Sequence, residues 1–255
     1  WVDKGGINKV LTYLGLMKHP SILVLALVLS VPSVLAQPEV SLGADLVSRY
    51  VWRGLDFGQS AAVQPSIEVG VGGFSAGTWG SFGITDANAN ELDLYLSYAV
   101  GPVTVGVTDY HFPGVGLDPG TESTSDYFNF DDGGGGHTLE PFVSYQGEAV
   151  PLSLTLATNV YNDPDYSTYL EAGYGFAVGG VDLGLAVGAV FALDSADGTQ
   201  GSGYYATSND AAITVLSLTA AKEVPITTEF ALPVFGQYVV NPETERSFLL
   251  FGISL

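Results

Sequence analysis

Strict alternation of apolar and polar side chains along residues 91–112 is the feature that most constrains the fold. Before Gly101-Pro102 an apolar residue occupies every second position, and after this turn Val103, Val105 and Val107 repeat the pattern. Successive side chains of a β-strand point to opposite faces, so the stretch predicts a hairpin whose strands each have one apolar and one polar face. Each strand has about ten residues, the length at which a tilted strand crosses a bilayer.

The same alternation recurs along the chain and predicts twelve strands. They span residues 39–53, 63–71, 74–84, 91–100, 103–112, 138–146, 151–161, 168–178, 181–193, 210–222, 226–240 and 245–255. Short connections such as Gly72-Gly73 and Gly179-Gly180 alternate with longer polar ones, which is typical of outer-membrane barrels. Backbone groups in lipid are all paired only if the sheet closes. The sequence therefore predicts an all-β fold, an up-and-down antiparallel transmembrane β-barrel of about twelve strands.

The first 36 residues predict export. Met17-Lys18 forms a short basic start, residues 21–31 are an apolar run, and Val34 and Ala36 supply the small residues expected before a cleavage site. The apolar run is too short to span a bilayer as a helix. We interpret residues 1–16 as a non-native N-terminal extension, residues 17–36 as a cleaved signal peptide, and residues 37–255 as a barrel exported through the periplasm to the bacterial outer membrane.

The charge balance restricts the partners. The chain has 27 Asp and Glu residues against 7 Lys and Arg residues, and 4 of these 7 cations follow residue 36. Phosphate contacts require Lys and Arg, so no nucleic acid is expected as a partner. Without cysteine, the chain has neither disulfides nor thiolate metal ligands. The expected partners are outer-membrane lipid and lipopolysaccharide on the outside and small hydrophilic solutes or cations inside.

The polar strand faces predict the lining of a pore. If the apolar faces contact lipid, the lumen-facing positions include the charged residues Asp45, Arg49, Arg53, Glu68, Glu91, Asp93, Glu140, Glu171 and Glu229. Strand direction places most of them, namely Arg49, Arg53, Glu91, Asp93, Glu140 and Glu171, in the outer half. Rings of Asp and Glu favour cations. The residues therefore predict a porin-like channel for passive diffusion of small solutes that prefers cations and needs no cofactor.

A filled barrel is the alternative. Eight-stranded barrels are filled by side chains and barrels of about 16 strands hold a water channel, so twelve strands fall between these cases. The same charges would then form a salt-bridged plug, and the molecule would be a non-conducting structural or adhesive barrel with acidic surface loops.

An enzyme is a third hypothesis, which rests on the residues around the longest irregular segment. His111 and His137 flank this segment, and Ser123 and Ser125 lie within it. A lipid hydrolase requires a His beside a nucleophilic Ser, but no spacing here fixes a triad. The acidic residues 118–132 do not match the spacing of a calcium loop, and residues 133–136 lack the context of a phosphate loop. We therefore assign no catalytic, cofactor-binding or metal-ligating residue.

Three segments resemble the TorF-type porin family. Ser48-Arg49-Tyr50-Val51-Trp52-Arg53-Gly54 resembles its N-terminal signature. Residues 90–95 with 106–110 resemble its central hairpin, and residues 240–243 with 251–254 its C-terminal hairpin. The resemblance covers essentially all of residues 37–255 and implies an outer-membrane barrel that forms a channel. It implies no catalytic residues.

Overall fold

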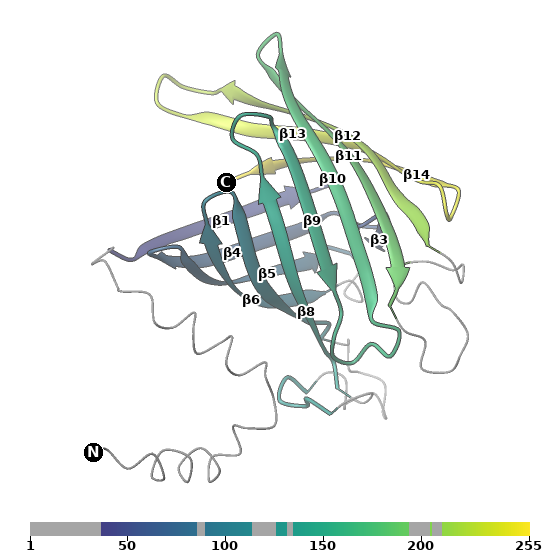
Figure 1. Cartoon of the computed structure of the whole chain (residues 1–255). Coiled ribbons are helices and arrows are strands. Elements are labelled where there is room, and N and C mark those ends of the chain that lie inside the picture. Colours follow the sequence, from purple (N-terminus) through teal and green to yellow (C-terminus); the bar gives the residue numbers. More distant parts are fainter. Residues whose placement is uncertain (1–36, 86–89, 114–125, 132–134, 194–204, 206–210) are drawn as a thin grey trace. The chain divides into compact units, whose positions relative to one another are not determined.

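Twelve antiparallel strands close into a barrel in the computed structural model of the chain (Figure 1). The structure describes residues 37–85, 90–113, 126–131, 135–193, 205 and 211–255, and residues 38–255 belong to one compact unit. The proposed extension and signal peptide lie outside the described residues. Among the described residues, no helix is long and apolar enough to cross a membrane.

The barrel strands follow one another around the wall in chain order. They are β1 (Glu39–Val47), β4 (Ala62–Val71), β5 (Phe74–Gly83), β6 (Glu91–Val100), β7 (Val103–His111), β8 (His137–Gln146), β9 (Leu152–Thr158), β10 (Ser167–Val178), β11 (Val181–Ala192), β12 (Ala212–Pro225), β13 (Ala231–Asn241) and β14 (Arg246–Ser254). The barrel closes where Asp45, Leu46 and Val47 of β1 pair with Ser254, Ile253 and Gly252 of β14. The predicted fold class, an all-β up-and-down antiparallel barrel of twelve strands, is confirmed.

The two faces of the wall differ in chemistry as the alternation requires. Large apolar side chains such as Val105, Leu154, Leu218 and Phe251 are exposed on the outer face. A water-soluble protein rarely exposes so large an apolar surface, whereas a bilayer matches it. The opposite face encloses the lumen and combines polar and small residues with a cluster of buried apolar side chains that includes Val190 and Phe248.

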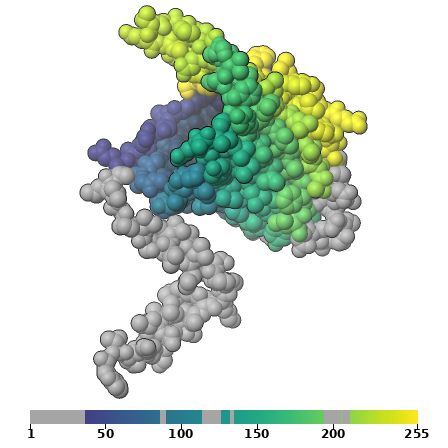
Figure 2. Space-filling model, turned by 45° about the horizontal axis from the view of Figure 1, so that its top comes forward, coloured from purple at the N-terminus to yellow at the C-terminus, as the bar shows by residue number. Residues whose placement is uncertain are grey.

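Connection length separates the two rims. Residues 72–73, 101–102, 147–151, 179–180 and 226–230 connect strands at one rim, and the longer connections lie at the other, together with the short turn 242–245. The tips of β10–β11 and β12–β13 project beyond their neighbours at the short-turn rim (Figures 1 and 2). The turn expected at residues 223–225 lies at 226–230, because β12 continues to Pro225.

The first predicted strand is wrong in its second half. β1 ends at Val47, and residues 50–58 form a separate hairpin of β2 (Tyr50–Trp52) and β3 (Leu55–Gly58) that is not part of the wall. Arg53 and Gly54 both adopt positive φ, 50° and 82°, and connect Trp52 to its partner Leu55. Two successive positive φ values characterise the tight turns that match the twist of a β-hairpin. The alternation of 50–52 therefore belongs to this hairpin.

Candidate functional site

The β2–β3 hairpin lies inside the barrel and contacts the wall on opposite sides. The Tyr50 ring packs 5.4 Å from Trp79 of β5, and the Trp52 ring 5.3 Å from Tyr110 of β7 (centroid distances). On the other side, Asn241 Nδ2 of β13 donates a hydrogen bond of 3.0 Å to the carbonyl oxygen of Gly54. The hairpin therefore narrows the lumen towards the long-connection rim.

An apolar cluster supports the hairpin from β10 to β14. Its buried wall residues include Val190, Val215, Val239 and Phe248, and the partly buried Val51, Trp52 and Leu55 of the hairpin pack against them. Burial of apolar area stabilises such contacts by about 25 cal/mol per Å². The hairpin is thus docked through a small core of its own inside the lumen.

Arg53 joins the hairpin to β8 through a buried ion pair. Its Nη2 donates to Glu140 Oε1 at 2.8 Å, and its Nη1 donates to Glu140 Oε2 and, at 2.5 Å, to the Tyr205 hydroxyl. Tyr110 Oη donates to Glu140 Oε1 at 2.8 Å. The guanidinium carbon lies 4.2 Å from the Trp52 ring centroid and 4.4 Å from that of Tyr169. Such bidentate and stacked geometry is specific to arginine.

The surroundings keep the charge of Arg53 fixed. Burial would lower the pKa of Arg53, but the hydrogen bonds to Glu140 outweigh it and raise the pKa above its usual range. Burial raises the pKa of the Tyr205 phenol, and the carboxylate of Glu140 adds to this although Arg53 opposes it. Tyr205 therefore stays protonated and donates its hydrogen bond of 3.1 Å to Glu140 Oε2.

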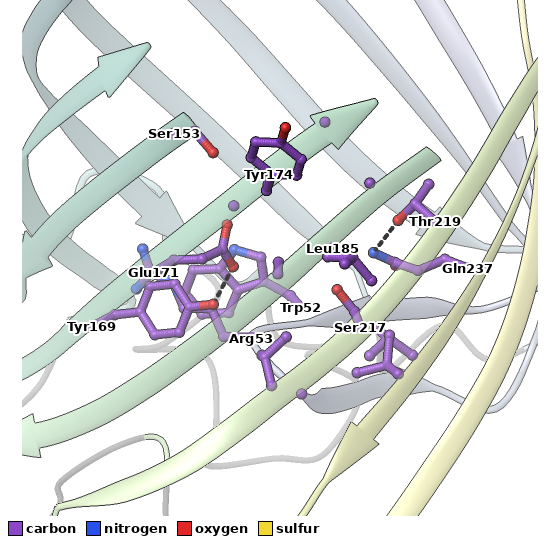
Figure 3. A pocket seen from close by; sticks show the side chains of 18 of the residues that line it. Trp52, Arg53, Ser153, Tyr169, Glu171, Tyr174, Leu185, Ser217, Thr219 and Gln237 are labelled. Atoms are coloured by element: carbon purple, nitrogen blue, oxygen red, sulfur yellow. Dashed lines mark hydrogen bonds between the residues drawn. The ribbon is translucent and has the colours of Figure 1, made fainter. Parts of the chain in front are cut away.

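A cavity of about 580 Å³ lies between the hairpin and the short-turn rim. Trp52, Arg53 and Gly54 of the hairpin line one end, and Gln146 and Pro151 lie at the other. Figure 3 shows Tyr169 and Glu171 gathered beside Trp52 and Arg53, with Ser217, Thr219 and Gln237 across the space. Tyr169 donates to the Glu171 carboxylate, and Gln237 Nε2 donates to Thr219 Oγ1 at 3.1 Å. This part of the lumen is hollow, and its lining combines neutral polar side chains with apolar ones such as Val215 and Val239.

The predicted lumen carboxylates have different surroundings. Glu171 lines the cavity, whereas Glu140 is held by Arg53. Glu68 accepts hydrogen bonds from Tyr95 and Ser75 at 3.0 and 3.2 Å. Asp45 shares the inner face of β1 with the buried Val47.

Glu91 and Asp93 are buried, with exposed fractions of 1% and 6%. Neither residue lines the cavity.

Three predicted positions need correction. Arg49 and Arg53 lie on or beside the inward hairpin and not on a barrel strand, because β1 ends at Val47. Glu229 lies in the exposed 226–230 connection, because β13 begins only at Ala231. Arg49 is 3.5 Å from Asp56 of β3, so this pair belongs to the hairpin itself.

The predicted lining consists of charged residues and leaves out the neutral ones that line the cavity. Ser153, Ser217, Thr219 and Gln237 occupy lumen-facing positions that the alternation alone would have identified. Tyr205 lies in a long connection between β11 and β12, where no periodicity marks a residue that reaches the lumen.

His137 holds the segment 126–131 against the barrel. Its Nδ1 lies 2.9 Å from Asp109 Oδ1 and its Nε2 lies 2.7 Å from the carbonyl oxygen of Tyr127. The ring stacks between Phe130 and His111, with centroids at 3.9 and 4.5 Å. Both ring nitrogens therefore lie within hydrogen-bonding distance of an oxygen, and these contacts fix the orientation of the ring. Ser123 and Ser125 of the hydrolase hypothesis lie outside the described residues.

Metal ligands do not gather in the described part of the chain. There, no group of three or more His, Asp or Glu side chains is arranged to hold a metal ion. Most of the acidic segment 118–132 lies outside the described residues.

Two solved structures are similar to this chain at low identity. A NanC porin structure has 11% identity and a TM-score of 0.44, covering 84% of this chain and 98% of its own. An outer membrane channel from Pseudomonas putida F1 has 11% identity and a TM-score of 0.40, covering 87% of this chain and 96% of its own. The comparison with curated proteins gives no match.

A family profile provides the stronger relationship. The profile described as "Bacterial protein of unknown function (Gcw_chp)" matches residues 35–190, which include β1 to β10 and the inward hairpin. This description does not carry the TorF-type name, so that resemblance stays a prediction. Because the match covers more than half of the chain, the protein belongs to the bacterial Gcw_chp family of unknown function.

Proposed function

We propose that this protein is an outer-membrane channel through which small hydrophilic solutes diffuse passively, with a preference for cations. The observation that carries the proposal is the polar cavity inside the barrel, whose wall includes Glu171. A barrel that only scaffolded the membrane would gain stability from filling this space with packed side chains.

The outer face supports a membrane location. The exposed apolar side chains of the wall form a surface that lipid chains would cover, and the twelve strands have the even number and sorted connections of outer-membrane barrels. Short turns face the periplasm in such barrels, so the hairpin would narrow the outer half of the lumen and the cavity would open from the periplasmic half.

The distribution of ion pairs supports the cation preference. Arg53 is neutralised by Glu140, and Arg49 lies beside Asp56. Within the described part of the chain, no ion pair joins a cation to Asp45, Glu68 or Glu171. The lumen therefore carries an excess of negative charge, which attracts cations and repels anions.

A non-conducting barrel is the second candidate, and one observation favours it. The hairpin touches β5, β7 and β8 on one side and β13 on the other, so it crosses the lumen. If its contacts leave no continuous water path, the protein would be a plugged structural or adhesive barrel. Conductance separates the two candidates.

The selectivity of the pore tests the proposal. In a planar bilayer under a KCl gradient, the reversal potential of the wild-type protein should be shifted from zero towards the equilibrium potential of K⁺. Glu171→Gln should lower the permeability ratio of K⁺ to Cl⁻ by about twofold, because it removes one carboxylate from the water-filled part of the lumen.

Glu148→Gln is the matched control, because Glu148 is exposed in the 147–151 turn and does not line the cavity. It should leave the reversal potential close to the wild-type value. An anion-selective wild-type pore, or a Glu171→Gln pore with unchanged selectivity, would contradict the assignment of Glu171.

A further inference from the structure

The charge of the cavity is set by one carboxylate. The charged side chains that line it are Arg53 and Glu171. Both carboxylate oxygens of Glu140 are already used by Arg53 and by the hydroxyls of Tyr110 and Tyr205, so Glu140 cancels the charge of Arg53 and of no other group. The carboxylate of Glu171 is left as the net charge facing the cavity.

Glu171 is also held in place. The hydroxyl of Tyr169 donates to one of its carboxylate oxygens, and the Tyr169 ring is fixed by its stacking on Arg53. A positioned carboxylate next to a water-excluding aromatic wall binds a cation more strongly than a mobile one in open water, since less conformational freedom is lost on binding and the local dielectric is lower.

Beside apolar residues such as Val215 and Val239, the wall offers neutral hydrogen-bonding groups. Hydroxyls come from Ser153, Ser217 and Thr219, and amides come from Gln146 and Gln237. These groups both donate and accept, which matches a ligand rich in hydroxyls. The volume of about 580 Å³ lies within the roughly 300–1,000 Å³ usual for small-molecule pockets.

Glycines create the space. Gly175 of β10 and Gly184 of β11 line the cavity, and a Cβ on either would find its nearest described atom at 4.0 Å and 3.8 Å, respectively. At both positions the wall has room for a side chain that the sequence does not supply. The cavity can therefore be filled by substitution without moving the backbone.

We propose that this cavity is a binding subsite for a small polyhydroxylated cation, with the carboxylate of Glu171 facing its amine and the hydroxyl and amide side chains of β9, β12 and β13 facing its hydroxyls. The inference rests on the proposed channel function, because it names the class of solute that the lumen retains. It predicts selection by charge among ligands of equal shape.

Three probes that share a hydroxylated carbon chain isolate the charge. At neutral pH, N-methylglucamine is a cation, sorbitol is neutral and gluconate is an anion. Binding to the refolded protein in detergent micelles is measured by calorimetry, which does not depend on conduction. N-methylglucamine should bind about tenfold more tightly than sorbitol, and gluconate should not bind, because only N-methylglucamine brings a positive charge to the Glu171 carboxylate and a pair enclosed in the cavity is less screened than an exposed one.

Two substitutions locate the binding. Glu171→Gln should bring the affinity for N-methylglucamine down to that for sorbitol. Gly184→Val should abolish binding of both by filling the cavity. Gly70→Val is its matched control, because Gly70 lies on the inner face of β4 outside the cavity, where a Cβ would lie 3.8 Å from its nearest atoms. Heat-modifiable gel migration confirms that each variant forms the barrel.

The outcomes separate this inference from the channel itself. Equal affinity of the wild-type protein for N-methylglucamine and sorbitol, or binding that survives Gly184→Val, overturns the subsite. A cation-selective pore that binds none of the probes overturns the subsite and leaves the channel in place. Charge-selective binding by a protein that passes no current supports the subsite and overturns the channel.

Discussion

At the scale of single residues, Arg53 is the side chain on which the arrangement of the lumen depends most. Its guanidinium joins the hairpin to Glu140 of β8 and to the hydroxyl of Tyr205. Its side chain is 9% exposed and that of Glu140 is 2% exposed. An ion pair this deeply buried is stabilising only while both partners remain, since either charge alone would be buried without compensation.

Replacing Arg53 should therefore destabilise the barrel strongly. Arg53→Met leaves the Glu140 carboxylate buried without its cation, and we expect a loss of about 3–5 kcal/mol in the free energy of unfolding. The double variant Arg53→Met with Glu140→Met should recover part of this loss. Urea unfolding of the refolded protein in vesicles measures both.

Arg49→Met is the control for this comparison. The Arg49 side chain is 34% exposed and lies 3.5 Å from Asp56, so we expect a loss below about 1 kcal/mol. Equal losses for Arg49→Met and Arg53→Met would mean that the buried pair does not anchor the hairpin.

The sequence predicts residue types in the lumen better than it predicts their pairings. Alternation placed Glu140 and Glu171 on inward faces, and both positions are inward in the structure. It could not show that Glu140 would be neutralised by Arg53, which is 87 residues away along the chain, whereas Glu171 would face a cavity. Pairings of this kind depend on the tertiary path of the hairpin, which strand periodicity does not encode.

At the scale of elements, the β2–β3 hairpin has the main effect, because it lies inside the barrel and narrows the lumen. The alternation of β1 continues without a break through residues 48–52 into this hairpin, which is why it predicts one long strand over 39–53. Arg53-Gly54 is the two-residue turn of this hairpin, and the alternating segment 55–58 follows it. Such turns are usually recognised in a sequence by Asn-Gly or Asp-Gly, and Arg-Gly is not one of these pairs. The strong apolar pattern of Tyr50 and Trp52 serves packing inside the lumen, not contact with lipid.

Gly54 tests how the tip of this hairpin docks. Its φ is +82°, and a Cβ would lie 2.9 Å from the carbonyl carbon of Thr214 and 3.2 Å from Asn241 Nδ2. Gly54→Ala should therefore both strain the turn and push the tip away from β12 and β13. We expect a larger fall in the urea midpoint than for Gly101→Ala, together with a rise in single-channel conductance.

Gly101→Ala separates strain from docking. Gly101 also has positive φ, +56°, but nothing lies within 4 Å of its Cβ position. Its substitution should cause only the backbone penalty of about 1–2 kcal/mol and leave the conductance unchanged. Identical effects of the two substitutions would show that the contacts of the tip with β12 and β13 affect neither the stability nor the conductance.

At the scale of the whole molecule, the barrel follows from period-two patterning that is simple enough to read from the sequence. Every barrel strand has a predicted counterpart, and most bounds agree within about two residues. The larger errors are at β1 and β9, where the alternation continues past the end of the strand, and at β12 and β13, where the turn between the two strands begins only after Pro225. Closure itself follows from physics, because an open edge in lipid would leave backbone groups unpaired.

We expect this barrel to conduct ions through a lumen that the hairpin narrows. Single-channel current in a planar bilayer under a KCl gradient measures this conduction, recorded for the wild-type protein and for a variant in which residues 49–58 are replaced by a short Gly-Ser linker. We predict discrete cation-selective steps for the wild type and larger steps for the variant. A silent wild-type protein that gel migration shows to be folded would contradict the claim and identify a plugged barrel, and equal step sizes would contradict the role of the hairpin.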